Sequence, residues 1–195
     1  MGAFTMRSFN LLAGIIAAMA ACGTALAQTP VYENVGRSPT DEEVRAWDIS
    51  IGPEGKELPP GSGTAQEGAN IYARRCAVCH GPTGTEAQWN SGRLVGGQGT
   101  LRDNLPTRTI GSFWPFATTI FDFVRRAMPQ NEEGKLSADE LYSLTAFLLF
   151  KNGIIKENEV LDAKSLPKVQ MPNRNGFVPP VEDLRRWRCP GPSCP

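Results

Sequence analysis

The sequence has almost no histidine: His80 is the single one among 195 residues. A second imidazole for acid–base catalysis is therefore missing. An excess of charge of either sign is missing too, since 20 Lys and Arg balance 20 Asp and Glu. No basic surface then indicates nucleic acid as a partner. Long hydrophobic runs are absent after the first 27 residues, which predicts no stable membrane span in a chain that has lost them.

The one apolar run lies at the N-terminus, where residues 1–27 are predicted to be a signal peptide. Arg7 precedes the apolar stretch 11–21, and Ala25-Leu26-Ala27 offers small residues for cleavage. The stretch is shorter than the ~20 residues that a spanning helix needs. An uncleaved anchor, or a lipoprotein formed at Cys22, are the alternatives. The favoured prediction is export to the periplasm.

The rest of the chain predicts an all-α fold with irregular extensions at both ends. Residues 28–63 are predicted as an extended arm and linker, 64–153 as the folded domain, and 154–195 as a C-terminal tail that packs on the domain or on a partner. Thr64 with Glu67, and Ser137 with Glu140, are capping boxes that begin helices. The expected helices are 40–47, 64–76, 115–127, one from 137 to about 153, and a short one at 181–187.

Cys76-Ala77-Val78-Cys79-His80 carries the chemistry, because it is the attachment sequence of c-type haem. Two thiols separated by two residues reach the two vinyl groups on one edge of the porphyrin, and the adjoining histidine reaches the iron. A thioredoxin-like redox pair would need a helix that starts at the first cysteine, whereas here a helix is predicted to end there. A zinc site would need a fourth ligand from the distant Cys189 or Cys194.

The sixth iron ligand must then be something other than histidine. Methionine is common in haem proteins that transfer electrons, and it raises the reduction potential. Beyond residue 27 the sequence has two methionines, Met128 and Met171, each followed by proline. Met128 is favoured because it directly precedes the last strong helix, and Met171 stays open as the alternative. Cys189 and Cys194 are free to form a disulfide in an oxidising compartment.

The order of capped helix, Cys-x-x-Cys-His, glycine-rich loop, Met-Pro and capped helix resembles the class I cytochrome c fold over about 64–153. A narrower resemblance covers about 92–177, with the stretches TIGSFWPFATT, FDFVRRAMP, NGII and MPNRNGF. These are similar to the cytochrome subunit of the periplasmic sulfane dehydrogenase of the thiosulfate-oxidising system. That subunit pairs with a molybdenum-containing subunit related to sulfite dehydrogenases. The best-known members carry two haem domains, whereas this chain has one attachment motif.

The resemblance implies a monohaem electron-transfer protein that is not itself an enzyme. Its partner would be a molybdopterin sulfane or sulfite dehydrogenase subunit, and one haem c would be attached covalently. The alternative is a haem enzyme such as a peroxidase or a thiosulfate-oxidising cytochrome. Trp114 is a candidate for contact with a haem carboxylate, with core packing as the alternative. Arg93 is a candidate for the same kind of contact, with solvent exposure as the alternative.

Overall fold

The computed structural model describes residues 35–86 and 91–178, and the chain divides into two units, 1–47 and 48–195. The predicted signal peptide, the predicted helix at 181–187 and the Cys189–Cys194 pair lie outside the described residues. In the first unit, helix α2 (Asp41–Trp47) matches the predicted one. The amide of Glu43 donates to the Thr40 hydroxyl, and the amide of Thr40 donates to the Glu43 carboxylate, as a capping box requires.

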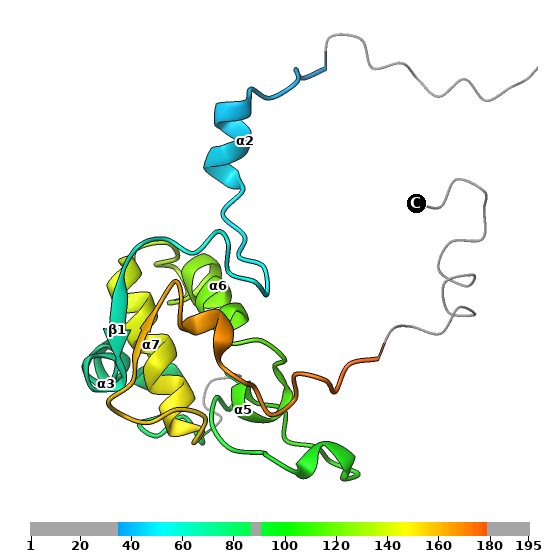
Figure 1. Cartoon of the computed structure of the whole chain (residues 1–195), viewed down its shortest axis with the longest axis vertical. Helices are drawn as coiled ribbons and strands as arrows, with labels where there is room; N and C mark the ends of the chain where they lie inside the picture. Colours follow the sequence, from blue (N-terminus) through cyan, green and yellow to red (C-terminus); the bar gives the residue numbers. More distant parts are fainter. Residues whose placement is uncertain (1–34, 87–90, 179–195) are drawn as a thin grey trace, which may run out of the picture. The chain divides into compact units, whose positions relative to one another are not determined.

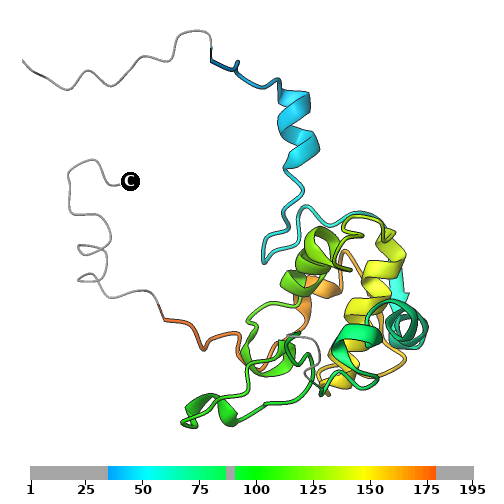
Figure 2. The same cartoon turned by 180° about the vertical axis from the view of Figure 1, so that it is seen from behind.

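The second unit is mostly helical (Figures 1 and 2). Its elements are β1 (Ser62–Thr64), α3 (Ala65–Arg75), α4 (Ala77–His80), η1 (Thr100–Arg102), α5 (Ile110–Phe113), α6 (Thr118–Ala127), α7 (Ala138–Lys151), β2 (Val160–Asp162) and η2 (Leu166–Lys168). The two strands form a small antiparallel sheet, in which Gly63 faces Leu161. The prediction of a helical class I cytochrome c fold is confirmed, with this two-stranded sheet as an addition. No helix in the described ranges is long and apolar enough to cross a membrane.

Helices α3 and α7 form the centre of the domain, and Figure 1 shows α3 nearly end-on beside the long α7. Both begin at the predicted capping boxes, at Thr64 and Ser137. Helix α7 is buried along almost all its length, which explains how few polar residues it has. The two helices approach closely at Gly68, where an added Cβ would lie 1.9 Å from the backbone oxygen of Ser143. Because glycine carries only a hydrogen in place of a Cβ, the backbones of α3 and α7 are in contact here.

Replacing Gly68 with alanine is expected to destabilise the domain by about 1–3 kcal/mol, because the extra methyl group forces α3 away from α7. The backbone of Ser143 and the Cβ of Phe147, 2.8 Å from the added atom, cannot give way as a flexible side chain would. Denaturant unfolding of the holoprotein measures the effect. The exposed Asn70→Ala on the same helix is the control, with an expected change within about 0.5 kcal/mol. Equal stabilities for the two variants would contradict the close crossing.

The compact unit extends beyond both ends of the predicted domain 64–153. On the N-terminal side, Ile51 and Leu58 are buried in the core, although they fall in the predicted arm and linker. The carboxylate of the buried Asp122 accepts a hydrogen bond from the Ile51 amide at 3.0 Å. On the C-terminal side, Leu161, Leu166 and Met171 are buried. Residues 154–178 therefore pack on the domain and complete its core.

The predicted helix at 115–127 is observed as α6, which begins three residues later at Thr118. A separate short helix, α5, precedes it and was not predicted. Its capping box pairs Thr109 with Ser112 in place of the usual Glu or Gln. Helix α7 ends as a Schellman motif, in which the Gly153 amide donates to Phe150 and the Ile154 amide to Leu149. Gly153 has φ of 69°, the left-handed conformation that this ending requires.

Candidate functional site

The two thiols and the imidazole of the attachment motif lie on a single turn of helix. Helix α3 ends at Cys76, whose amide donates to Tyr72 O, and α4 follows at once. The amides of Cys79 and His80 both donate to Cys76 O, at 3.1 and 2.9 Å. Residues at i, i+3 and i+4 share a face of a helix. The turn therefore presents Cys76, Cys79 and His80 together on one side.

His80 is oriented through its second ring nitrogen. Its Nδ1 lies 3.1 Å from the backbone oxygen of Gly92. A carbonyl oxygen only accepts hydrogen bonds, so Nδ1 carries the proton and Nε2 keeps its lone pair. Metal-binding histidines are characteristically fixed in this way. The imidazole is thus prepared as a ligand through Nε2.

Neighbouring groups hold this turn against the domain. The Tyr72 hydroxyl donates to Gly81 O at 2.8 Å, directly after His80. The ring of Tyr72 packs on Phe147 of α7, with a centroid distance of 4.9 Å. Burial raises the pKa of Tyr72 to about 12, so the hydroxyl stays protonated as a donor. The Ser91 hydroxyl donates to Cys79 O and joins the following loop to the same turn.

The two cysteines are free thiols with different surroundings. Cys79 is exposed, and Cys76 is half-buried against the core. Burial, and then the neighbouring Cys79, raise the pKa of the Cys76 thiol to about 11. A thiol with so high a pKa is a poor candidate for a thiolate redox catalyst. Within the described ranges, no three His, Cys, Asp or Glu side chains converge to hold a metal ion.

Met128 lies where α6 ends, and its backbone is already extended. The loop after it returns to the attachment motif, because Glu132 forms an ion pair with Arg75, the residue before Cys76. A hollow of about 500 Å³ lies between these segments and is lined by Arg74, Arg75, Pro129, Gln130, Asn131 and Glu132. The fold therefore brings the segment that carries Met128 next to the one that carries Cys76.

Met171, the alternative ligand, has a different environment. Its side chain is 4% exposed and belongs to the hydrophobic core. Trp114 is half-buried, and its ring meets Phe123 edge-on at 5.7 Å, while Arg93 is exposed. The contacts of these two residues with the haem carboxylates stay a prediction.

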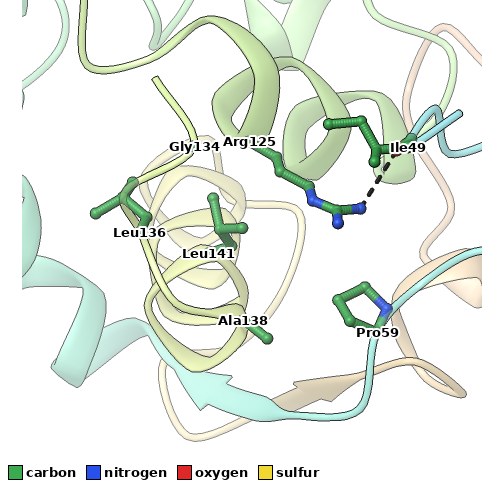
Figure 3. Close-up of a pocket in the computed structure, with 7 residues that line it drawn as sticks. All are labelled: Ile49, Pro59, Arg125, Gly134, Leu136, Ala138 and Leu141. Atoms are coloured by element: carbon green, nitrogen blue, oxygen red, sulfur yellow. Dashed lines mark hydrogen bonds between the residues drawn. The ribbon is translucent and has the colours of Figure 1, made fainter. Parts of the chain in front are cut away.

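A separate cavity of about 350 Å³ contains none of the predicted site residues (Figure 3). It is lined by Ile49, Pro59, Arg125, Gly134, Leu136, Ala138 and Leu141. The Arg125 guanidinium donates to Ile49 O at 3.3 Å across it. This hydrogen bond joins α6 to the N-terminal edge of the unit.

Comparison with known proteins identifies the family. Residues 63–148 match the family model described as cytochrome C oxidase, cbb3-type, subunit III. The structure superposes with a TM-score of 0.71 on a chain of the sulfane dehydrogenase SoxCD from Paracoccus pantotrophus. The two sequences are 37% identical over 83% of this chain and 82% of the other. The chain belongs to the class I c-type cytochromes. No match was found among curated proteins.

Membership of the cytochrome c family implies haem c as the cofactor, and the residues present fit that group. The donor set consists of two thiols and one imidazole on a single turn, with the imidazole proton already engaged by Gly92.

Two features of this cytochrome site were not predicted from the sequence. The first is the Gly92 carbonyl, which is 12 residues from His80 and is a backbone group that no motif marks. The second is Tyr72, which was predicted to face inward but whose hydroxyl also secures the end of the motif. Its spacing of seven residues from Cys79, two helical turns, was the available signal.

Proposed function

We propose that this cytochrome is a periplasmic monohaem electron carrier that serves a molybdenum sulfur-compound dehydrogenase as its cytochrome subunit or electron acceptor. Cys76 and Cys79 would bind the haem by thioether bonds, and His80 and Met128 would ligate its iron. The observation that carries the proposal is the His80 imidazole, which is held through Nδ1 on the same turn as the two thiols. The haem supplies reversible Fe(III)/Fe(II) exchange, and the chain supplies its attachment, ligands and burial.

The assignment of Met128 as the second axial ligand rests on placement. The loop that follows Met128 is joined to the attachment motif by the Arg75–Glu132 ion pair. An exposed ion pair of this kind contributes little stability, so it indicates proximity more than energy. Met171, by contrast, fills the core beside the residues of the tail. The assignment is testable by replacing each methionine with leucine, because leucine has a similar volume and no sulfur.

The proposed partner is supported by the similarity to sulfane dehydrogenase, at 37% identity over most of both chains. The similarity extends over 83% of this chain, and it supports an equivalent part for this cytochrome beside such a dehydrogenase. The periplasmic location rests on the predicted signal peptide at residues 1–27 and on the proposed covalent attachment of haem c. One attachment motif in the sequence supports one haem.

A haem enzyme such as a peroxidase or thiosulfate-oxidising cytochrome is the competing function. It needs an open sixth coordination position, or a cysteine ligand, and commonly a second acid–base group near the iron. The described residues contain no histidine besides His80, and their two cysteines are in the attachment motif. The residues therefore favour electron transfer over catalysis at the haem.

The experiment that tests this proposal is a spectroelectrochemical titration of the purified, exported protein. A single one-electron wave and an unchanged coordination state in both oxidation states are expected. Hydrogen peroxide is then added to the reduced protein in the presence of an electron donor. Rapid catalytic turnover of peroxide would favour the haem enzyme, whereas slow, stoichiometric oxidation supports the electron carrier.

A further inference from the structure

Asn152 stands at the end of α7, 72 residues after His80 in the sequence, and it is 8% exposed. Its side-chain amide makes three hydrogen bonds. Nδ2 donates to Leu148 O of its own helix at 2.8 Å and to Leu94 O at 3.1 Å. Oδ1 accepts from the Gly96 amide at 3.1 Å. Two of these three bonds go to a loop far away in sequence.

The backbone of Asn152 is part of the same connection. Its carbonyl oxygen accepts a hydrogen bond from Gln98 Nε2 at 2.9 Å. The side chain also lies against α5, since a Cβ at Gly111 would be 2.3 Å from Asn152 Oδ1. A helix cap would need none of these long-range contacts, because Gly153 already ends α7 in a Schellman motif. The side chain therefore holds the loop 94–96 through Leu94 and Gly96.

That loop is the continuation of the segment that orients His80. Leu94 is held on both sides, by Gly84 O at its amide and by Asn152 at its carbonyl. Gly96 is held likewise, by Asn152 at its amide and by the Thr109 hydroxyl at its carbonyl. Two residues before Leu94 is Gly92, whose carbonyl accepts the hydrogen bond from His80 Nδ1. The position of that carbonyl thus depends on the segment that Asn152 fixes.

We infer that Asn152 is a positioning residue for the axial histidine: it holds the loop 94–96 so that Gly92 O stays on His80 Nδ1, and it thereby sets the reduction potential. The inference rests on the proposed ligation by His80. A hydrogen bond to the outer nitrogen makes a ligating imidazole a stronger donor, which favours the oxidised protein. Loosening that bond makes the imidazole a weaker donor and raises the reduction potential.

The test compares Asn152→Ala with Asn173→Ala in the full-length holoprotein. Asn173 is a matched control, since its amide also donates to a distant carbonyl, Phe113 O at 2.7 Å, but not in this loop. Asn152→Ala is expected to shift the equilibrium between oxidised and reduced protein about tenfold toward the reduced form, about 59 mV for one electron. Asn173→Ala is expected to leave the potential unchanged.

Two nuclear magnetic resonance readouts separate positioning from general stability. In the reduced protein, the Nδ1 proton of His80 is expected to exchange with solvent at least tenfold faster in Asn152→Ala, and the Gly96 amide likewise. Asn152→Asp keeps the acceptor for Gly96 but loses both donors, so it is expected to free Leu94 while protecting Gly96. This nearly isosteric variant supplies the answer if the alanine variant fails to fold.

The inference is overturned if Asn152→Ala and Asn152→Asp lose stability but keep the wild-type potential and the wild-type exchange of the His80 proton. Asn152 would then be a structural cap of α7. If instead His80 does not ligate the haem iron, the wild-type protein itself would lack the signature of a haem-bound His80. The exchange of the Gly96 amide reports on the loop in either case.

Discussion

Cys76→Ala/Cys79→Ala is expected to abolish covalent haem. Thioether bonds survive denaturing electrophoresis and acid–acetone extraction, whereas iron–ligand bonds do not. The double variant should therefore lose all haem from the denatured chain, and the mass of the chain should fall by one haem. Each single variant, Cys76→Ala or Cys79→Ala, retains one thioether and is expected to keep the haem.

The single variants also serve as controls for folding and export. They should show an absorption spectrum with one unsaturated vinyl group remaining, between those of c-type and b-type haem. Haem that stays attached to the denatured double variant would refute the attachment. Since the half-buried Cys76 thiol lies against the core, its loss is expected to cost more stability than the loss of the exposed Cys79.

The second large effect is expected at the sixth ligand. Met128→Leu removes the sulfur while conserving volume, so the fold should persist. We expect loss of the weak far-red charge-transfer band that marks methionine on ferric haem. The reduction potential should fall, because methionine ligation raises it. The vacant position should also bind carbon monoxide or cyanide readily.

Met171→Leu is the matched control, and it is expected to keep the band and the potential. As a buried core residue, Met171 tolerates leucine at a cost below about 1.5 kcal/mol. If the band is lost in Met171→Leu and kept in Met128→Leu, the axial assignment moves to Met171. The tail would then supply an iron ligand in addition to the core side chains Leu161 and Leu166.

The parts of the fold that were predictable from sequence are those with local signals. Helices α3 and α7 begin at Thr64 and Ser137 because a capping box satisfies free backbone amides within three residues. The inward stripe of α7 was predicted on Leu141, Leu144 and Leu148, and these side chains are buried. The attachment motif is equally local, since five consecutive residues specify its chemistry.

What the sequence did not reveal depends on contacts between distant segments. The capping box of α5 uses Ser112 in place of a carboxylate, and its partners at Gly96 and Thr107 lie in the preceding loop. Residues 154–178 look irregular because their burial comes from single side chains, such as Leu166, and from the pairing of β2 with β1. Asn152 carries no local signal either, since two of its side-chain partners are 56 and 58 residues away.

The measurement that tests the account most directly is reduction of the oxidised cytochrome by a molybdenum sulfur-compound dehydrogenase. The two purified proteins are mixed without oxygen, and a sulfane or sulfite substrate is added while the haem spectrum is followed. The account predicts that one electron enters each cytochrome, with reduction that depends on both the dehydrogenase and its substrate. A dehydrogenase that turns over with an artificial acceptor, yet leaves the haem oxidised, would contradict it.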